Sequence, residues 1–141
     1  MSETSSDTKS VVVERELRHA PEKIWRALTQ PALIEAWLMQ NDFTPQVGRR
    51  FVLRTNPAPH WSGVINCDVL EVDPPARLAY TWRALGLETV VTWTLTPTKR
   101  GTRVRMEQSG FRRDQRANYG GAQVGWPRFI DALERTLAGL D

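Results

Sequence analysis

The sequence predicts an α+β fold in which an antiparallel sheet of about six strands is covered on one face by a single long C-terminal helix. Between residues 49 and 109, apolar side chains alternate with polar ones, which is the period of a strand with one buried face. After Gly120, apolar side chains instead recur every three or four positions, the period of an amphipathic helix. Because a sheet with one apolar face needs a cover, we expect this helix to lie across it.

Residues 120–141 are expected to form that helix. Asp131 and Arg135 are four positions apart on its polar side and can pair there. Pro127 leaves two alternatives, because proline removes a backbone hydrogen bond from a helix interior. Either the helix begins near Trp126 with Pro127 in its first turn, or a longer helix is kinked at Pro127. The apolar stripe consists of Trp126, Phe129, Ile130, Leu133, Leu137 and Leu140.

The N-terminal part of the chain predicts a tail, a strand and two short helices. Residues 1–10 are polar and are expected to be a disordered tail, whereas 11–141 should form a single domain. Residues 11–18 begin apolar and then alternate, as a strand does. A first helix should open at Pro21 and end before Pro31. A second then buries Leu33, Ile34, Trp37 and Leu38.

The middle of the chain is typical of an antiparallel meander. In the longest strand both alternating sets are apolar, and we favour the one with Ile65, Cys67 and Val69 inward because it lacks Asn66 and Asp68. The expected strands are 49–55, 61–73, 77–83, 88–96 and 102–109, and the expected loops are 39–48, 56–60 and 110–118.

Composition limits the function more than it defines it. The 141 residues favour one domain, and a net charge of +3 is too small to indicate nucleic acid by itself. The lone Cys67 excludes an intramolecular disulfide and fits a reducing compartment. Without a secretory signal or an apolar run long enough to span a membrane, the expected location is cytoplasmic. The six tryptophans serve either as large core residues or as the lining of an aromatic cavity.

No catalytic residue, metal site or cofactor is predicted. Cys67 lies within a strand among apolar neighbours, which is typical of a buried, inert thiol. His19 and His60 lack metal-ligand spacing. The glycine-rich run 119–125 fits neither phosphate-binding fingerprint and is interpreted as a flexible entry to the helix. Three arginines in the preceding loop are either solvated charges or a contact for an anion or an acidic partner; they are Arg112, Arg113 and Arg116.

A cavity between sheet and helix is the site that the pattern favours, with a solid core as the alternative. Strand parity and the helical stripe select the side chains that would line it, and Gln108 and Tyr80 would orient a ligand. The expected lining is Phe51, Leu53, Tyr80, Trp82, Trp93, Val104, Met106, Gln108, Trp126, Ile130 and Leu133.

Six stretches, taken in order, carry a family resemblance: APEKIWRALTQPALIEAWL, VGRRFVL, VLEVDPPARLAYTW, VTWTLTP, GTRVRMEQSGF and GWPRFIDAL. With the first strand they span about residues 11–139. They resemble the C-terminal domain of the activator of the ninety-kilodalton heat-shock chaperone ATPase and its stand-alone bacterial relatives, in the START-like, helix-grip (SRPBCC) superfamily. The resemblance implies a curved sheet that grips the helix over a cavity for apolar or aromatic molecules, including lipids and polyketides.

Three functions follow as hypotheses. The preferred one is binding of an apolar or aromatic small molecule. The second is an enzyme that uses the same cavity, for example a polyketide cyclase or hydrolase, for which Glu71 and Tyr80 are the ionisable residues to examine. By parity Glu107 points outward. The third is a protein-interaction module like the co-chaperone domain, and a chaperone ranks behind a small molecule as the expected partner.

Overall fold

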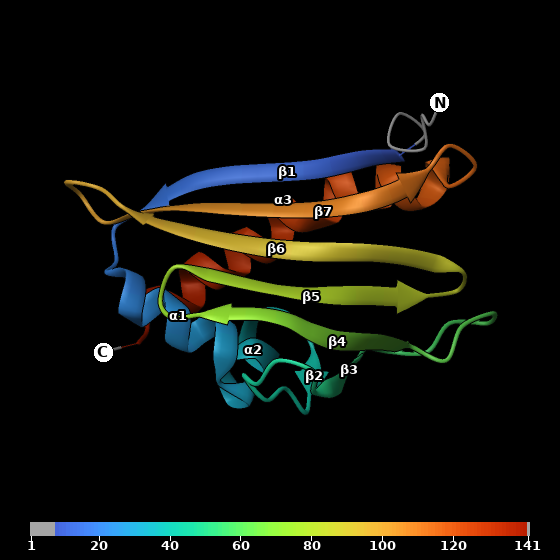
Figure 1. The fold of residues 1–141 in the computed structure, drawn as a ribbon, viewed down its shortest axis with the longest axis horizontal. Coiled ribbons are helices and arrows are strands. Elements are labelled where there is room, and N and C mark those ends of the chain that lie inside the picture. Colours follow the sequence, from blue (N-terminus) through green and yellow to red (C-terminus); the bar gives the residue numbers. More distant parts are fainter. Residues whose placement is uncertain (1–7, 141) are drawn as a thin grey trace.

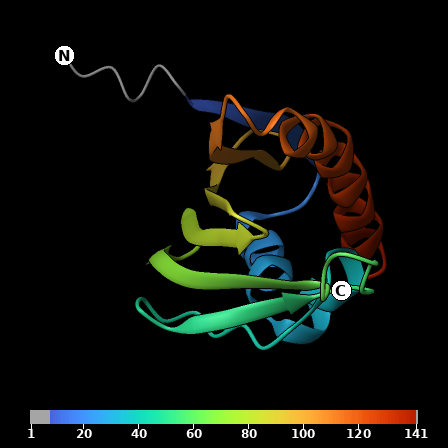
Figure 2. The ribbon, with the colours of Figure 1, turned by 90° about the vertical axis from the view of Figure 1, so that its right-hand side faces the viewer.

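The computed structural model describes residues 8–140 and shows a curved antiparallel sheet around one long helix (Figures 1 and 2). This confirms the predicted α+β fold. The strands are β1 Thr8–Leu17, β2 Gln40–Asn41, β3 Arg50–Arg54, β4 Val64–Asp73, β5 Arg77–Ala84, β6 Leu87–Pro97 and β7 Thr102–Arg112. The helices are α1 Pro21–Thr29, α2 Pro31–Trp37 and α3 Arg116–Ala138.

The strand order is β1-β7-β6-β5-β4-β3-β2, so the first and last strands of the chain lie side by side. The remaining neighbours follow one another in sequence, as expected for a meander. After β7 the chain turns back as α3, which runs diagonally behind the strands in Figure 1. Helices α1 and α2 pack against α3 near its C-terminal end, and together the three helices cover the inner face of the sheet.

Several boundaries differ from the expected ones; for example, the expected strand 61–73 begins only at Val64, because Trp61 forms an isolated bridge with Ala58 in the preceding loop. β1 begins at Thr8, so residues 8–10 belong to the sheet and not to a tail; residues 1–7 lie outside the described part of the chain. A seventh strand, β2, lies within the expected loop 39–48. It was not predicted, because two residues are too few to show alternation. β7 continues past residue 109, because Gly110 adopts a φ of 107° and forms a bulge that preserves pairing with β1.

Helix α3 begins at Arg116, ten residues before Trp126, and contains Pro127 in its interior. The expected loop 110–118 is therefore shorter, and the glycine-rich run is helical. Tertiary contacts explain the difference: the ring of Tyr119 packs on Phe111 of β7, with ring centroids 5.5 Å apart. Packing of this kind overrides the low helix propensity of glycine and proline.

Strand parity is confirmed through most of the sheet. Ile65, Cys67 and Val69 of β4 point inward and are at most 2% exposed. The outer face carries ion pairs, such as Arg83 with Asp68 at 2.6 Å, and exposed pairs of this kind each contribute about 0–1 kcal/mol. No helix within residues 8–140 is both long and apolar enough to cross a membrane.

Arg15 of β1 attaches α3 to the edge of the sheet. Its Nη1 donates to Asp131 Oδ1 at 2.6 Å and to Glu134 Oε1 at 2.9 Å. Partial burial acts to lower the pKa of Arg15, but the two carboxylates raise it above its ordinary value. In place of the expected pairing of Asp131 with Arg135 on the helix, Asp131 contacts the sheet.

The docking of α3 yields a stability prediction for Leu133, which is 0% exposed. Leu133→Ala should lower the free energy of unfolding by about 2–5 kcal/mol, because it removes buried methyl groups and leaves a cavity. A urea titration measures the loss. Val124→Ala on the same helix is the control, since Val124 is 56% exposed. A loss below about 1 kcal/mol for Leu133→Ala would contradict the docking.

Candidate functional site

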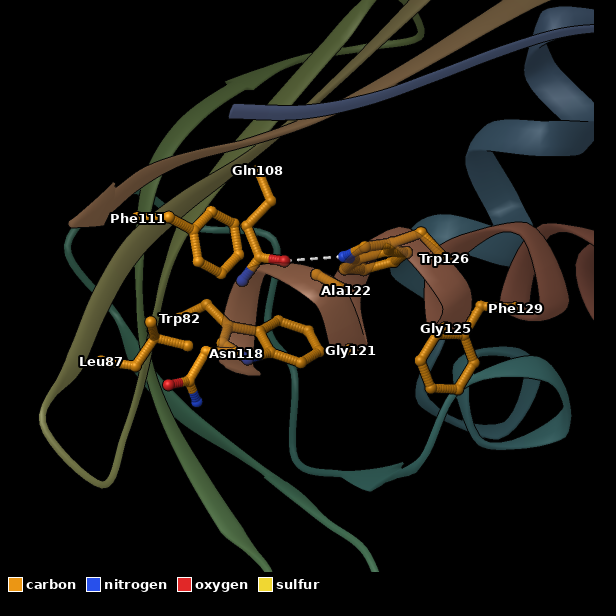
Figure 3. A pocket seen from close by; sticks show the side chains of 10 residues that line it. All are labelled: Trp82, Leu87, Gln108, Phe111, Asn118, Gly121, Ala122, Gly125, Trp126 and Phe129. Atoms are coloured by element: carbon orange, nitrogen blue, oxygen red, sulfur yellow. Dashed lines mark hydrogen bonds between the residues drawn. The ribbon is translucent and has the colours of Figure 1, made fainter. Parts of the chain in front are cut away.

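A pocket of about 190 Å³ lies between the first half of α3 and the ends of β5, β6 and β7 (Figure 3). The sheet contributes Trp82, Leu87, Gln108 and Phe111. The helix contributes Asn118, Gly121, Ala122, Gly125, Trp126 and Phe129. The walls are therefore mainly aromatic and aliphatic, which is the composition typical of a small-molecule site.

A tight hairpin turn positions the sheet side of the pocket. Leu85 and Gly86 join β5 to β6 with φ values of 50° and 81°, the positive pair that a two-residue type I′ turn requires. The Gln115 side chain just before α3 donates from Nε2 to the Gly86 carbonyl at 3.3 Å. Its Oε1 accepts from the Arg112 backbone N–H at 2.9 Å. These two bonds hold the start of α3 against both the turn and β7.

Buried aromatic rings form one wall. The Trp126 ring lies 5.4 Å from that of Trp82 and 5.5 Å from that of Phe129, between centroids, and both pairs are inclined. On its far side Trp126 meets the edge of Trp93 at 5.9 Å. Such pairs contribute about 0.5–1.5 kcal/mol beyond the area they bury. Trp126 thus separates the pocket from the centre of the core.

Gln108 provides the polar anchor of this wall (Figure 3). Its Oε1 accepts from Trp126 Nε1 at 2.7 Å, and its Nε2 donates to Thr89 Oγ1 at 2.9 Å. The Thr89 hydroxyl in turn donates to the Trp82 carbonyl at 2.9 Å. Gln108 is only 2% exposed, so these bonds satisfy groups that would be costly to bury alone.

Two polar groups at the pocket have no hydrogen-bond partner within residues 8–140. They are the indole N–H of Trp82 and the side-chain amide of Asn118. Asn118 is exposed, and the Trp82 N–H is not fully buried although the residue as a whole is only 9% exposed. A bound molecule with an acceptor atom could use both groups.

The helix side of the pocket is formed partly by glycine. Gly121 and Gly125 are four residues apart and therefore lie on the same face of α3. A Cβ built at either position would meet no atom within 4 Å. The space is therefore open and would be reduced by any larger residue.

The expected cavity residues separate into two groups. Trp82, Gln108 and Trp126 line the pocket. The others are 0–5% exposed and do not line it; they are Phe51, Leu53, Tyr80, Trp93, Val104, Met106, Ile130 and Leu133.

Aromatic contacts explain this division. Phe43, from the expected loop 39–48, packs on Phe51 at 4.9 Å, and Trp37 of α2 packs on Trp93 at 5.5 Å. These rings occupy the middle of the inner face. Strand alternation did not identify Leu87 and Phe111, because both lie just beyond the expected ends of their strands. The glycines were expected to form a flexible entry to the helix, and their shared face was not recognised as part of a site.

No acid–base pair faces the pocket among its lining residues. Glu71 instead accepts a hydrogen bond from Arg77 at 3.0 Å on the outer face. Tyr80 accepts from Trp93 Nε1 at 3.2 Å, and burial raises the pKa of Tyr80, which keeps its hydroxyl neutral. Glu107 accepts from Arg105 at 2.9 Å and points outward, as parity predicted.

The thiol and the histidines occupy separate places. Burial raises the pKa of Cys67 to about 12, so its thiol stays protonated near neutral pH. Burial lowers the pKa of His19, and the nearby Lys23 adds to this effect. Within residues 8–140, no three His, Cys, Asp or Glu side chains gather as metal ligands would.

A curved sheet closed by two short helices and gripping a long third helix defines the helix-grip class of START-like proteins. The chain belongs to the Activator of Hsp90 ATPase homolog 1-like protein family, whose model matches residues 18–138. No curated protein matches it.

Solved structures share the fold across almost the whole chain. A protein of Mesorhizobium loti is 55% identical, with a TM-score of 0.89, and the match covers 94% of this chain and 99% of that one. For a protein of Rhodobacter sphaeroides the identity is 27%, the TM-score 0.76 and the coverage 94% and 93%. CalU16 from Micromonospora echinospora is 22% identical, with a TM-score of 0.77 and coverage of 94% and 78%.

The hydrogen bond between Gln108 and Trp126 predicts a measurable loss on substitution. Gln108→Leu should lower the free energy of unfolding by about 1–3 kcal/mol, because the buried indole N–H loses its acceptor. Gln123→Leu, at an exposed glutamine of α3, is the control and should change stability by less than about 0.5 kcal/mol. Equal effects of the two substitutions in a denaturant melt would contradict the role of Gln108.

The raised pKa of Cys67 predicts a protected thiol. At pH 8 the folded protein should react with iodoacetamide far more slowly than the urea-unfolded chain, because only the thiolate is nucleophilic. Mass spectrometry counts the added groups, and Cys67→Ser provides the background. Similar rates for folded and unfolded chains would show that the thiol is accessible and ionised.

Proposed function

We propose that this protein binds a small apolar or aromatic molecule in the pocket between α3 and the ends of β5, β6 and β7. The observation that carries the proposal is an open space with aromatic walls and glycines on its helix side. Such a space is costly for a protein to keep, since filling a cavity normally increases stability. A bound ligand would provide the missing contacts. The lone reduced Cys67 supports a cytoplasmic setting.

The volume limits the size of the ligand. A dry apolar cavity of about 150 Å³ holds benzene in another protein, whereas drug-sized ligands occupy about 300–1,000 Å³. At about 190 Å³, this pocket suits one ring or two fused rings. A longer molecule would extend past Asn118 and Phe129, the more exposed of the lining side chains, into solvent.

The polar groups limit its chemistry. Trp82 offers an N–H donor and Asn118 an amide, while the lining residues include no charged side chain. An uncharged ring with an oxygen acceptor, such as a phenol or a ketone, would satisfy the indole N–H without burying a charge. One protein that shares the fold, DynU16, is a protein in the dynemicin biosynthetic locus, and this setting is a further reason to test small organic ligands.

Binding without catalysis is the function that the pocket supports best. General acid–base catalysis needs an ionisable group within reach of the ligand, and the lining residues carry none. A co-chaperone role would need a continuous apolar surface. The large exposed apolar side chains instead come from separate segments; they are Val12, Val47, Leu70, Leu85 and Val124.

Adjacent glycines on α3 allow a matched test with 2-naphthol, a neutral bicyclic phenol. Gly121 lines the pocket, whereas Gly120 does not, and a Cβ at either meets open space. Gly121→Leu and Gly120→Leu should both gain helix propensity of up to about 1 kcal/mol. Only Gly121→Leu should lose binding.

The readout is thermal unfolding with and without 2-naphthol, supported by calorimetric titration. At a free 2-naphthol concentration about 100 times its dissociation constant, the original protein and Gly120→Leu should each be stabilised by about 2.7 kcal/mol. Gly121→Leu should be stabilised much less. Equal stabilisation of all three proteins would place the ligand elsewhere. No stabilisation by 2-naphthol or by a panel of similar neutral rings would contradict the proposal, and native mass spectrometry of protein from its own cell would then show whether any molecule is retained.

A further inference from the structure

A second hollow, the basic hollow, lies at the corner where β1, β7 and α3 meet and has a volume of about 700 Å³. Its charged and polar lining consists of Lys9, Arg112, Arg113, Arg116, Tyr119 and Gln123. We propose that this hollow binds a small organic molecule that carries a phosphate group.

The charge of the hollow is strongly one-sided. Its lining contains four cations and no carboxylate. Asp114, next to the hollow in sequence, accepts from Arg112 Nε at 3.3 Å. For comparison, the formal net charge of the whole chain is +3, so positive charge is concentrated at this corner. Like charges held together repel one another, and a bound anion would relieve that repulsion.

The fold creates this concentration of charge. The bulge at Gly110 carries β7 on to Arg112, which places it opposite Thr8 at the start of β1. Lys9 follows on β1, and its ammonium lies 5.5 Å from the centre of the Tyr119 ring on α3. The Tyr119 hydroxyl also donates to the Ser10 carbonyl at 3.4 Å. β1, from the start of the chain, thus meets β7 and α3, from its last part, at one concave site.

Shape and chemistry favour a phosphorylated small molecule. Guanidinium groups bind phosphate oxygens through paired, charge-assisted hydrogen bonds. The hollow is much larger than a phosphate ion and lies within the range of about 300–1,000 Å³ that is typical of organic ligands. The Tyr119 ring and the edge of Phe111 supply an apolar wall for the organic part. A nucleic acid would instead require a stripe of cations along an extended face.

The site is distinct from the aromatic pocket. Gly120 and Gln123 line the basic hollow, whereas Gly121 and Ala122 line the pocket, so the two spaces open on different sides of α3. Phe111 lies between them and contacts both. Binding at one site can therefore be lost while binding at the other is retained.

Phenyl phosphate is the probe. Its binding is measured by calorimetric titration, first at low salt and then in about 0.5 M NaCl, which is roughly three times physiological ionic strength and screens exposed charges. Phenol and inorganic phosphate are compared with it, to separate the contributions of ring and anion. Arg113→Gln combined with Arg116→Gln should reduce affinity for phenyl phosphate by about tenfold or more, because two charged donors are lost. Arg128→Gln, at an exposed arginine of α3 outside the hollow, is the control and should leave affinity unchanged.

The adjacent glycines provide a second, charge-neutral test. Gly120→Leu should weaken phenyl phosphate binding and Gly121→Leu should not, the reverse of the pattern expected for 2-naphthol. If Arg128→Gln and the double variant lost equal affinity for phenyl phosphate, the effect would depend only on net charge, and the proposal would be overturned. It would also be overturned if phenyl phosphate failed to bind, or if hexaglutamate or vesicles containing phosphatidylserine bound more tightly through the same arginines.

Discussion

The hydrogen bond from Trp126 to Gln108 is the contact on which the arrangement of helix, core and pocket depends. It joins α3 to β7 at 2.7 Å, and both residues are 2% exposed. A bond this well buried fixes the rotation of the helix as well as its position, because no water can replace either partner. With the rotation fixed, Gly121 and Gly125 line the pocket and Asp131 pairs with Arg15.

The Trp126 ring also divides the interior. On one side it meets Trp93, and from there the core is continuous through Tyr80 and Phe51, whose rings are 5.3 Å apart. On the other side, beyond Trp82, lies the pocket. A large rigid ring whose N–H is already satisfied can form such a boundary, since it packs on one face and leaves the other available. The pocket therefore lies at one end of α3, whereas the family resemblance implies a cavity between the sheet and the helix as a whole.

Periodicity predicted the parts of the fold that are governed by local pattern. Alternation identified the long strands and the inward set of β4, and the helical stripe identified Ile130 and Leu133 as buried. It could not predict β2, which is two residues long, or the continuation of β7 through Gly110, because both depend on pairing with distant strands. For the site, parity indicates which side chains face inward but not whether space remains between them. Phe43 shows the reason: it comes from an irregular segment and fills the middle of the core.

The composition of α3 is consistent with two hollows being maintained at the expense of helix stability. Each glycine in a helix interior costs about 1 kcal/mol relative to alanine, and Pro127 cannot donate to the carbonyl of Gln123. These unfavourable residues all lie in the half of α3 next to the hollows, whereas the half that contacts α1 and α2 has none before Gly139. Packing alone would favour alanine at Gly120, Gly121 and Gly125, where a Cβ meets no atom. Their presence is explained if the space beside them, and not the helix itself, is what the protein requires.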